Sequence, residues 1–540
     1  MRDQLALLPE YLTAHIQLSL LALLLGMLLS VPLGIWVSRR KRFEAAVLGI
    51  ASVLQTIPSL ALLAFMVPLL AAVGGLSARL FGFELSSIGF LPALMALTLY
   101  SILPMLRNTV TGLSGIDPAL IEAARGVGMT DRQRLWRVEF PLALPVIVAG
   151  VRTATVWVVG TATLATPVGQ TSLGNYIFSG LQTRNFIAVT LGSVAAAGLA
   201  LSLDALIRTL ESGLRRRSRA AVVSALVVLA ALYVYAGGTL ARDSLGGGVS
   251  PIRIGTKTFT EQYILAELMR GAIGARTGLP TRSVQSLGST VVFDALRSGE
   301  IDVYVDYSGT IWATIMKREK LPTRRSEVLG EVADYLAREH DIELVGALGF
   351  ENTYALAMRS AQARALGVET ISQLAGHAGR LEIGGDYEFF ARPEWTALTE
   401  RYGLAFRAKR SMDSALMYQA VAEGEVDVIS AFSTDGRIAA FELALLEDDR
   451  GVIPPYDAII LANGRLAAEW PQVIHALETL VGRIDAETMR RMNFAVDGHG
   501  ESLESVARRF LAGLASRPNR SRARGGNIGT AASPTMEERQ

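Results

Sequence analysis

The feature that most constrains this chain is an abrupt change of hydropathy near residue 240. Up to Gly238 the sequence is a succession of apolar blocks, and from Pro251 to about Ala515 it has the composition of a water-soluble protein. Half of all residues are hydrophobic and the mean hydropathy is +0.34, too apolar for an ordinary soluble protein of this length. The chain therefore combines a membrane body with a soluble domain, which favours a transporter with its own receptor, a sensor or a membrane-anchored enzyme.

The apolar blocks predict six membrane-spanning helices, because a helix needs about 20 apolar residues to cross the hydrocarbon core. The first block starts too late and runs too long for a cleaved signal peptide, and no small-residue cleavage site follows it. We therefore expect it to be a retained anchor. The six predicted spans lie near residues 15–37, 46–72, 88–107, 142–165, 186–207 and 220–237.

Lys and Arg residues gather in alternate loops between these spans. They cluster at residues 39–42, 125–137 and 215–219, whereas the other loops carry only Arg79 and Arg184. Basic loops stay in the cytoplasm according to the positive-inside rule. The N-terminus is then predicted outside, and six spans place the soluble half outside as well, in a multi-pass protein of the cytoplasmic (inner) membrane with its soluble domain on the periplasmic or extracellular face.

Composition argues against several functions. The net charge of +2 gives no case for a nucleic-acid partner, and the absence of cysteine excludes disulfides, zinc–thiolate sites and thiol catalysis. The five histidines are scattered singly, which favours structural roles over metal ligation. The chain has no phosphate-binding G-x-x-x-x-G-K-[ST] motif and no G-x-S-x-G nucleophile elbow. We therefore expect no cofactor, no metal and no enzymatic activity.

The basic segment between the third and fourth spans predicts two short helices. The first covers residues 117–126 and is broken by glycines, and the second covers 131–138 and is stopped by Pro141. The small side chains of Ala123 and Ala124 are expected on an exposed face, where they would fit a groove on a partner. An ordinary amphipathic connector between spans is the alternative.

The order of residues in this segment resembles the "EAA" coupling loop of binding-protein-dependent ABC importers. Glu, Ala, Ala and a glycine occur in that order, and a Leu-Pro pair follows at Leu144-Pro145. The resemblance implies docking on a separate ABC ATPase subunit, which would hydrolyse the ATP. It assigns that role to Glu122, Ala123, Ala124 and Gly126.

A later segment, residues 166–177, resembles the stretch after the fourth span in the betaine and choline branch of these permeases. Its glycines would permit a re-entrant bend that lines the transport pathway. A plain external turn is the alternative.

The soluble half contains an internal repeat, in which residues 289–308 recur as residues 414–433. Around it, short apolar runs alternate with helical patterns, which predicts βαβ units and open, mainly parallel sheets. Each copy of the repeat predicts a helix, a glycine cap, a Glu-x-Asp turn and a buried strand that ends in an aromatic residue. Ligands bind beyond the carboxyl ends of strands in such sheets. Two lobes would then face each other across a cleft, one offering Tyr307 and the other Phe432.

The soluble half also resembles the substrate-binding proteins for glycine betaine, choline, carnitine and related osmoprotectants. The resemblance runs from about residue 252 to 512 and implies a small quaternary-ammonium ligand. It is carried by the motifs at residues 255–265, 288–292, 352–355, 387–393, 433–437 and 454–458.

In that family an aromatic cage holds the quaternary ammonium group, and the resemblance places cage positions at Tyr307, Tyr354, Phe432 and Tyr456. The family commonly has tyrosine at the third position, so Phe432 keeps the π face and loses a hydroxyl. A trimethylammonium group has no N–H donor, so selectivity must come from shape and cation–π attraction.

A carboxylate at the other end of the ligand would require a cationic partner. The resemblance places Lys257 and Arg392 there, with Thr310 as a hydroxyl donor and Glu388 as a group that orients Arg392. Arg437 is a further residue that could reach the carboxylate.

Together these patterns predict an all-α transmembrane permease followed by an α/β two-lobed domain of the periplasmic-binding-protein type. The function is predicted as the permease and receptor of an ATP-driven importer for quaternary-ammonium compatible solutes, with a homodimer surrounded by membrane lipid. Import of another betaine, such as ergothioneine, is an alternative; the cytoplasmic loops are too short for the output module of a sensor. The predicted divisions are a permease at 1–219, a sixth span and linker at 220–250, a binding domain at 251–515 with crossovers near 353–357 and 452–457, and a disordered tail at 516–540.

Overall fold

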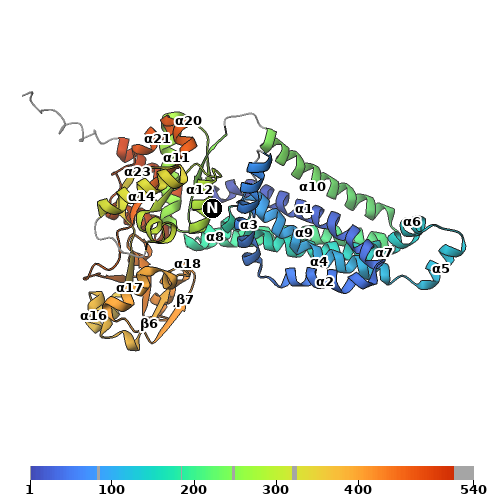
Figure 1. Ribbon diagram of the computed structural model, residues 1–540, viewed down its shortest axis with the longest axis horizontal. Helices are drawn as coiled ribbons and strands as arrows, with labels where there is room; N and C mark the ends of the chain where they lie inside the picture. The colour runs from blue at the N-terminus through green and yellow to red at the C-terminus, as the bar shows by residue number, and fades with distance from the viewer. Residues whose placement is uncertain (1, 82–85, 184, 246–249, 319–324, 516–540) are drawn as a thin grey trace, which may run out of the picture.

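The computed structural model describes residues 2–81, 86–183, 185–245, 250–318 and 325–515. A bundle of long helices and a two-lobed α/β domain lie end to end along the long axis of the molecule (Figure 1). The predicted tail at 516–540 and residues 246–249 of the predicted linker lie outside the described residues.

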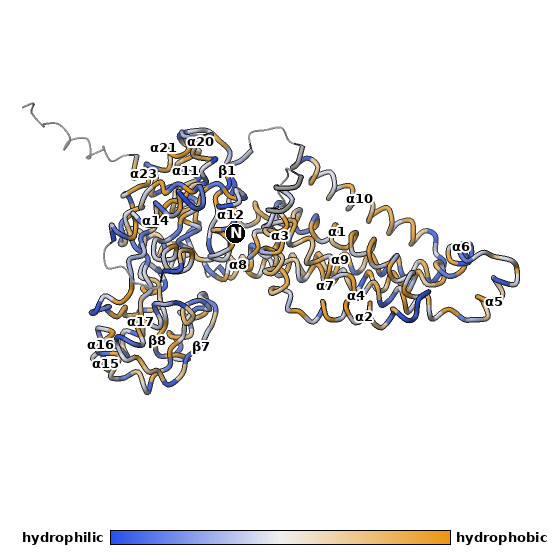
Figure 2. Tube along the Cα trace, viewed as in Figure 1, coloured by the Kyte–Doolittle hydropathy of each residue, from blue (hydrophilic) through white to orange (hydrophobic). Residues whose placement is uncertain are grey.

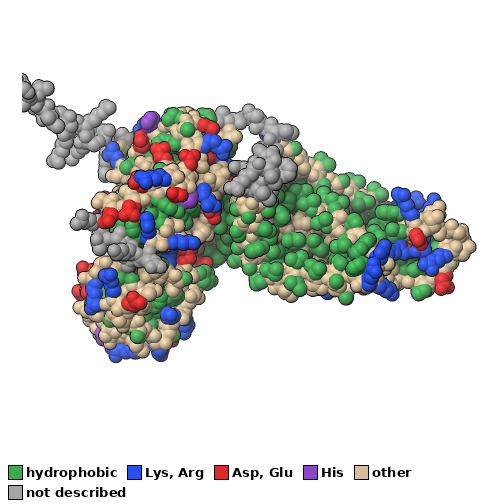
Figure 3. All heavy atoms as spheres, in the orientation of Figure 1, with side chains coloured by type: hydrophobic (Ala, Val, Ile, Leu, Met, Phe, Trp, Pro, Cys, Tyr) green, Lys and Arg blue, Asp and Glu red, His purple; other side chains and the backbone are tan. Residues whose placement is uncertain are grey.

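Within the described residues, five helices are long and apolar enough to cross a membrane. Apolar residues run along the length of the bundle, and its surface is a broad belt of hydrophobic side chains (Figures 2 and 3). The apolar belt confirms a multi-pass membrane protein. The five candidate spans correspond to α1 (Arg2–Ser38), α4 (Phe90–Ser114), α7 (Phe140–Ala162) with the turns on either side of it, α9 (Phe186–Arg215) and α10 (Arg219–Leu245).

The span predicted near residues 46–72 is a bent pair of helices. The chain forms α2 (Lys41–Thr56) and α3 (Ser59–Phe81), which meet at a bend of 99°. Ile57 between them is extended, with ψ 128°, a conformation that the ring of Pro58 favours at the preceding residue. The bent pair counts as a sixth span only if both helices are taken as one broken crossing.

The prediction that Pro141 stops the second coupling helix was wrong. Helix α6 (Asp131–Arg134) continues through a π-helical turn, η1 (Leu135–Glu139), into α7 without a break. Pro141 lies in the first turn of α7, directly after the wider turn, where a residue without an N–H is tolerated. One continuous helix therefore connects the coupling segment with the membrane.

The first coupling helix, α5 (Pro118–Gly126), lies at the end of the bundle farthest from the α/β domain (Figure 1). Glu122, Ala123 and Gly126 are exposed. Ala124 is buried at 5% exposure, so the expectation of an exposed Ala124 was wrong: the helix turns this side chain inward.

The α/β domain contains two five-stranded sheets with equivalent topology, one in each lobe. In both, the first three strands are mutually parallel and the fourth runs antiparallel to its neighbours. The first lobe has the order β2 (Thr281–Val284), β1 (Ile252–Gly255), β3 (Val303–Tyr307), β10 (Asp457–Asn463), β4 (Ile342–Glu351). The second lobe has the order β7 (Ala408–Ser411), β6 (Glu382–Gly385), β8 (Val428–Phe432), β5 (Tyr354–Arg359), β9 (Leu443–Leu446).

Helices cover these sheets, and the chain passes between the lobes twice, from β4 to β5 and from β9 to β10. The two copies of the sequence repeat form α12 with β3 and α18 with β8, at the same place in each lobe. The main helices are α11 (Thr260–Thr277), α12 (Ser289–Arg297), α14 (Arg325–His340), α15 (Ser360–Leu366), α17 (Pro393–Tyr402), α18 (Ser414–Glu423), α20 (Gly464–Glu469), α21 (Pro471–Glu478), α22 (Ala486–Asp497) and α23 (Leu503–Ala515).

The backbone just after β3 passes so close to the ring of Tyr456 that position 309 requires a glycine. The ring of Tyr456 packs over Gly309, and a Cβ added there would lie 2.7–2.8 Å from three ring carbons. Gly309→Ala should therefore cost about 1–3 kcal/mol of stability, as overpacking of a core does. The check is the thermal unfolding midpoint of the purified chain.

Gly330→Ala is the matched control for this substitution. Gly330 lies in α14 with nothing within 4 Å of an added Cβ, so alanine should leave the midpoint unchanged or raise it slightly. Equal midpoints for Gly309→Ala and the unmodified chain would contradict the packing argument.

Candidate ligand-binding site

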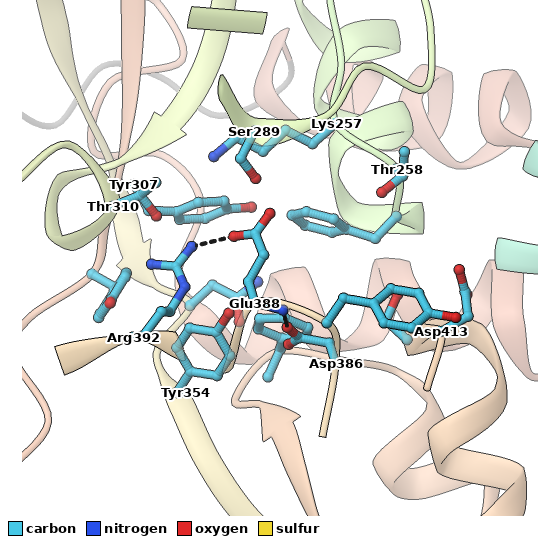
Figure 4. Close-up of a pocket in the computed structure, with 16 residues that line it drawn as sticks. Lys257, Thr258, Ser289, Tyr307, Thr310, Tyr354, Asp386, Glu388, Arg392 and Asp413 are labelled. Carbon is cyan, nitrogen blue, oxygen red and sulfur yellow. Dashed lines mark hydrogen bonds and ion pairs between the residues drawn. The ribbon is translucent and has the colours of Figure 1, made fainter. Parts of the chain in front are cut away.

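A cavity of about 160 Å³ lies between the two lobes. Its wall is formed mainly by residues at strand ends and in the loops next to them, as expected for open α/β sheets. Figure 4 shows Lys257 and Ser289 on one side of the cavity and Tyr354 and Asp386 on the other. All eight residues predicted as ligand contacts line this one cavity: Lys257, Tyr307, Thr310, Tyr354, Glu388, Arg392, Phe432 and Tyr456.

Aromatic rings from both lobes converge on the cavity. Tyr307 ends β3, and Tyr456 directly precedes the neighbouring strand β10. In the second lobe Tyr354 and Phe432 are register partners on β5 and β8, with ring centroids 5.0 Å apart. Tyr354 also meets Tyr456 edge to face at 6.1 Å, which joins the rings of the two lobes.

A fifth ring, Phe259, was not among the predicted contacts. It lies 5.9 Å from Phe432 with an interplanar angle of 7°, and 6.1 Å from Tyr307 at 26°. The available signal was its position in the loop after β1, at the same sheet edge as Tyr307. Its partner in the other lobe could not be identified from spacing along the chain.

Hydrogen bonds fix the orientation of two tyrosine rings. The Tyr307 hydroxyl donates to Glu261 at 2.6 Å, and the Tyr456 hydroxyl donates to Glu394. Burial and the Glu261 carboxylate raise the pKa of Tyr307 well above its usual value, so the phenol stays protonated. Both rings therefore present their π faces while their hydroxyls are held behind the cavity wall.

Lys257 is already paired in this arrangement. Its ammonium group forms a buried ion pair with Asp306, and it lies 5.4 Å from the centre of the Tyr307 ring. The structure thus brings Lys257 to the cavity wall with its charge balanced by a carboxylate.

Arg392 is buried and only partly satisfied. One terminal nitrogen donates to Glu388 at 2.6 Å, and the guanidinium lies 5.2 Å from the centre of the Tyr354 ring. Its Nε–H is buried and has no hydrogen-bond partner among the described residues. Burial opposes ionisation of Glu388, but Arg392 outweighs this and lowers the pKa of Glu388. The unpaired Nε–H of this ionised guanidinium can donate to an additional carboxylate.

Asp386 is a second buried group that sequence reasoning missed. It follows β6, and its Oδ1 accepts hydrogen bonds from the N–H groups of Glu388 and Phe389 at 2.8 and 2.9 Å. Its Oδ2 has no partner among the described residues. Burial raises the pKa of Asp386 above the ordinary aspartate value. The only signal was its place after a short strand, which many aspartates share.

Arg437 does not contribute to the cavity wall. Its guanidinium is paired with Asp435 at 2.6 Å and stacks on Tyr418 at 4.2 Å, and the residue is only 2% exposed. The suggestion that it could reach a ligand carboxylate was therefore wrong.

The arrangement suits a small zwitterion. Aromatic rings from both lobes offer π faces for a cation, and Arg392 offers a buried donor for a carboxylate. A helical membrane body joined to a two-lobed domain with such a cavity is the architecture predicted for a transport protein that carries its own receptor.

Each half of the chain matches a known protein family. Residues 24–216 match the family described as the binding-protein-dependent transport system inner membrane component. Residues 250–513 match the substrate binding domain of ABC-type glycine betaine transport systems.

Individual relatives match either the whole chain or one of its two halves. The ergothioneine transport permease/ergothioneine binding protein of Helicobacter pylori is 29% identical over 501 residues, covering 90% of this chain and 87% of the relative. The choline transport system permease protein of Bacillus subtilis is 42% identical over 197 residues, covering 36% of this chain and 83% of the relative. The carnitine transport binding protein of Listeria monocytogenes is 29% identical over 296 residues, covering 54% and 95% respectively.

Among solved structures, a glycine betaine/carnitine/choline ABC transporter structure is 30% identical, with a TM-score of 0.44, and covers 48% of this chain and 98% of that one. On the family and sequence matches, the chain belongs to the binding-protein-dependent ABC importers, as an inner-membrane permease fused to a substrate-binding domain of the glycine betaine type. Such permease and binding components serve the uptake of osmoprotectant-like solutes and are not themselves enzymes.

The state of Asp386 yields a pH prediction for binding of a cationic ligand. Protonation removes its negative charge, so affinity should fall as pH is lowered through its pKa, which burial raises above the ordinary value. Calorimetry of the chain with glycine betaine across acidic pH measures this change of affinity.

Asp386→Asn keeps the size and the Oδ1 acceptor, and should bind more weakly with a flatter pH profile. Identical profiles for the two proteins would contradict the role of Asp386.

Proposed function

We propose that this chain imports a quaternary-ammonium compatible solute, such as glycine betaine, choline or carnitine. The observation that carries this proposal is the convergence of aromatic rings from both lobes on one small cavity beside a partly satisfied arginine. A trimethylammonium group cannot be recognised by hydrogen bonds, so a cavity lined by π faces is the chemistry it requires. The eight predicted contacts are proposed as its binding residues.

The expected energies are sufficient for capture at low concentration. Each cation–π contact contributes about 0.5–2 kcal/mol, with the larger values where water is excluded. Four or five rings therefore approach the roughly 8 kcal/mol that corresponds to micromolar affinity. A carboxylate on Arg392 would add a charge-assisted hydrogen bond, and would distinguish glycine betaine and carnitine from choline.

The proposed partners of this chain are inferred from the end of the helix bundle that lies opposite the α/β domain. Lys and Arg side chains gather there, around α2, α5 and α6, opposite the α/β domain (Figures 1 and 3). By the positive-inside rule that end is cytoplasmic, which puts the binding domain outside. We propose that a separate ATPase docks on α5 through Glu122, Ala123 and Gly126, with Ala124 packing behind them, and that two copies of the chain pair in the membrane.

Tyr354→Ala is the test of the cage. Removal of this ring should abolish calorimetric binding of glycine betaine, choline and carnitine by the purified chain, because Tyr354 contacts the rings of Phe432 and Tyr456. Tyr354→Phe keeps the π face and is the matched control, so it should retain most of the affinity. Undiminished binding by Tyr354→Ala would contradict the assignment of these rings as a ligand-binding cage.

Ergothioneine is a second candidate cargo, because one observation favours it specifically. Asp386 holds a buried carboxylate oxygen with no partner among the described residues, and Glu388 lies on the same cavity wall. Ergothioneine carries ring N–H groups that could donate to such oxygens, whereas glycine betaine has none. The fused ergothioneine permease and binding protein of Helicobacter pylori, similar over 90% of this chain, supports this alternative.

The two cargoes are distinguished by Asp386→Asn at neutral pH. Loss of a charge-assisted hydrogen bond should weaken ergothioneine binding about tenfold or more, whereas glycine betaine binding should fall by a smaller factor. Competition calorimetry with both ligands measures the difference. Equal losses for the two ligands, or no binding of ergothioneine, would exclude this candidate.

A further inference from the structure

The helix α7 of the permease borders a hollow on the surface of the bundle. The hollow consists of two adjoining depressions of about 360 and 500 Å³, which share Val156 and Trp157. The inner depression, toward the coupling segment, is also lined by Arg152 and Asp204, and the outer one by Gly160. Trp157 lies where the two meet and is 58% exposed. The hollow therefore presents a large aromatic face at the surface of a single chain.

A network of charged side chains borders the inner depression. Arg152, near the middle of α7, donates to Asp204 of α9 at 2.6 Å and to Glu211 of the same helix at 3.3 Å. Two further arginines of α9, Arg208 and Arg215, donate to these carboxylates at 2.8 and 2.5 Å. Although it is paired, the side chain of Arg152 is 33% exposed.

This charge indicates what the hollow faces. Ionisable side chains within a membrane span are costly against lipid, so they face the protein interior or a water-filled cavity. An exposed arginine near the middle of α7 therefore indicates that this face of the helix is turned away from lipid. With two copies of the chain paired as proposed, such a face lies between the copies, where a transport pathway would run.

The outer end of the hollow lies close to the binding domain. Thr163 and Leu164 line the outer depression and begin the turn η2 (Thr163–Val168). Gly169, directly after this turn, lies against the first lobe, because a Cβ added there would be 3.1 Å from Leu287. A solute that moves from the binding domain along α7 would therefore reach Trp157 before Arg152.

We propose that Trp157 forms a second binding site for the quaternary-ammonium group of the cargo, inside the permease. The site rests on the proposed function and extends it to the membrane half. Tryptophan is the aromatic side chain that attracts cations most strongly, especially where water is excluded. A carboxylate on the cargo would lie toward Arg152, whose Nη2 has no partner within the described residues. The hollow thus combines a ring and an arginine, as Tyr354 and Arg392 do in the receptor.

The two sites differ in how closely they enclose a solute. The receptor cavity measures about 160 Å³ and is bordered by rings from both lobes, whereas the inner depression alone measures about 360 Å³. A site on a transport pathway must release its ligand, so weak binding is what it requires. Trp157 therefore serves as a transit site that holds the cargo less tightly than the receptor does.

The natural absence of cysteine allows this site to be probed without cargo and without an ATPase. Gly160→Cys places a thiol in the hollow about one turn from Trp157, and a Cβ at this position meets nothing within 4 Å. The full-length chain in membranes is treated with two methanethiosulfonate reagents, one that carries a trimethylammonium group and one that carries a sulfonate. Mass spectrometry of the chain measures the rate of modification by each reagent.

Val227→Cys is the matched control for access of water. Val227 is 61% exposed on α10, next to the exposed apolar side chains of Val223 and Leu226. Reaction requires the thiolate, and apolar surroundings suppress its formation, so the thiol at 160 should react at least about tenfold faster than the thiol at 227. Equal rates at the two positions would place the hollow against lipid and overturn the proposal.

Replacement of Trp157 tests the ring itself. In the Gly160→Cys chain, Trp157→Leu should lower the ratio of the trimethylammonium rate to the sulfonate rate by about threefold or more, because the ring no longer attracts the cationic reagent. Trp157→Phe keeps a π face and should retain most of the ratio. Trp157 is exposed, so neither change threatens folding. An unchanged ratio in Trp157→Leu would overturn the proposal.

The result is separable from that of the proposed function. Calorimetric binding of betaines by the chain together with an unchanged ratio would leave the proposed function standing and exclude the transit site. A ratio that depends on Trp157 without any betaine binding at the receptor cavity would contradict the proposed function and leave the quaternary-ammonium site of the permease standing.

Discussion

The site depends on one geometric constraint, namely that two sheets of the same strand order direct their carboxyl strand ends at a shared cleft. Each parallel strand can place only its last residues, and the loop after them, in the cavity wall. The aromatic residues of the site therefore come from separate strands, such as Tyr307 on β3 and Phe432 on β8. These rings surround one volume only because both lobes contribute to the cavity wall.

Charge is distributed unevenly around this cleft. Lys257 is neutralised by Asp306, a buried pair whose separation would leave an uncompensated charge. Arg392 and Asp386, by contrast, each keep one buried polar atom without a partner among the described residues. Such atoms are costly in a core but are expected where a ligand completes the hydrogen bonding. The two unsatisfied groups thus indicate where new hydrogen bonds to a bound solute would contribute most to the binding free energy.

Much of the architecture could be predicted from sequence, because it follows from hydropathy and from the repeat of residues 289–308. Five of the eight predicted site residues lie in family motifs, and Tyr307 and Phe432 end the strands of the two copies of the repeat, so seven of the eight were marked by a pattern in the sequence. Phe259 was missed because its importance depends on its contact with Phe432 across the lobes, which local patterns do not encode. Asp386 was missed because nothing in the sequence distinguishes a buried aspartate after a short strand from an exposed one. Pro58 and Pro141 show the same limit: one breaks a span and the other is absorbed by a π-helical turn, and only the helix around each proline decides which occurs.

The unbroken helix that links the coupling segment to the membrane has a mechanical consequence. No non-helical residue separates α6, η1 and α7, so a displacement at the far end of the bundle cannot be absorbed in a loop. It is carried along the bundle as a movement of α7 as a whole, toward the end that carries the binding domain (Figure 1).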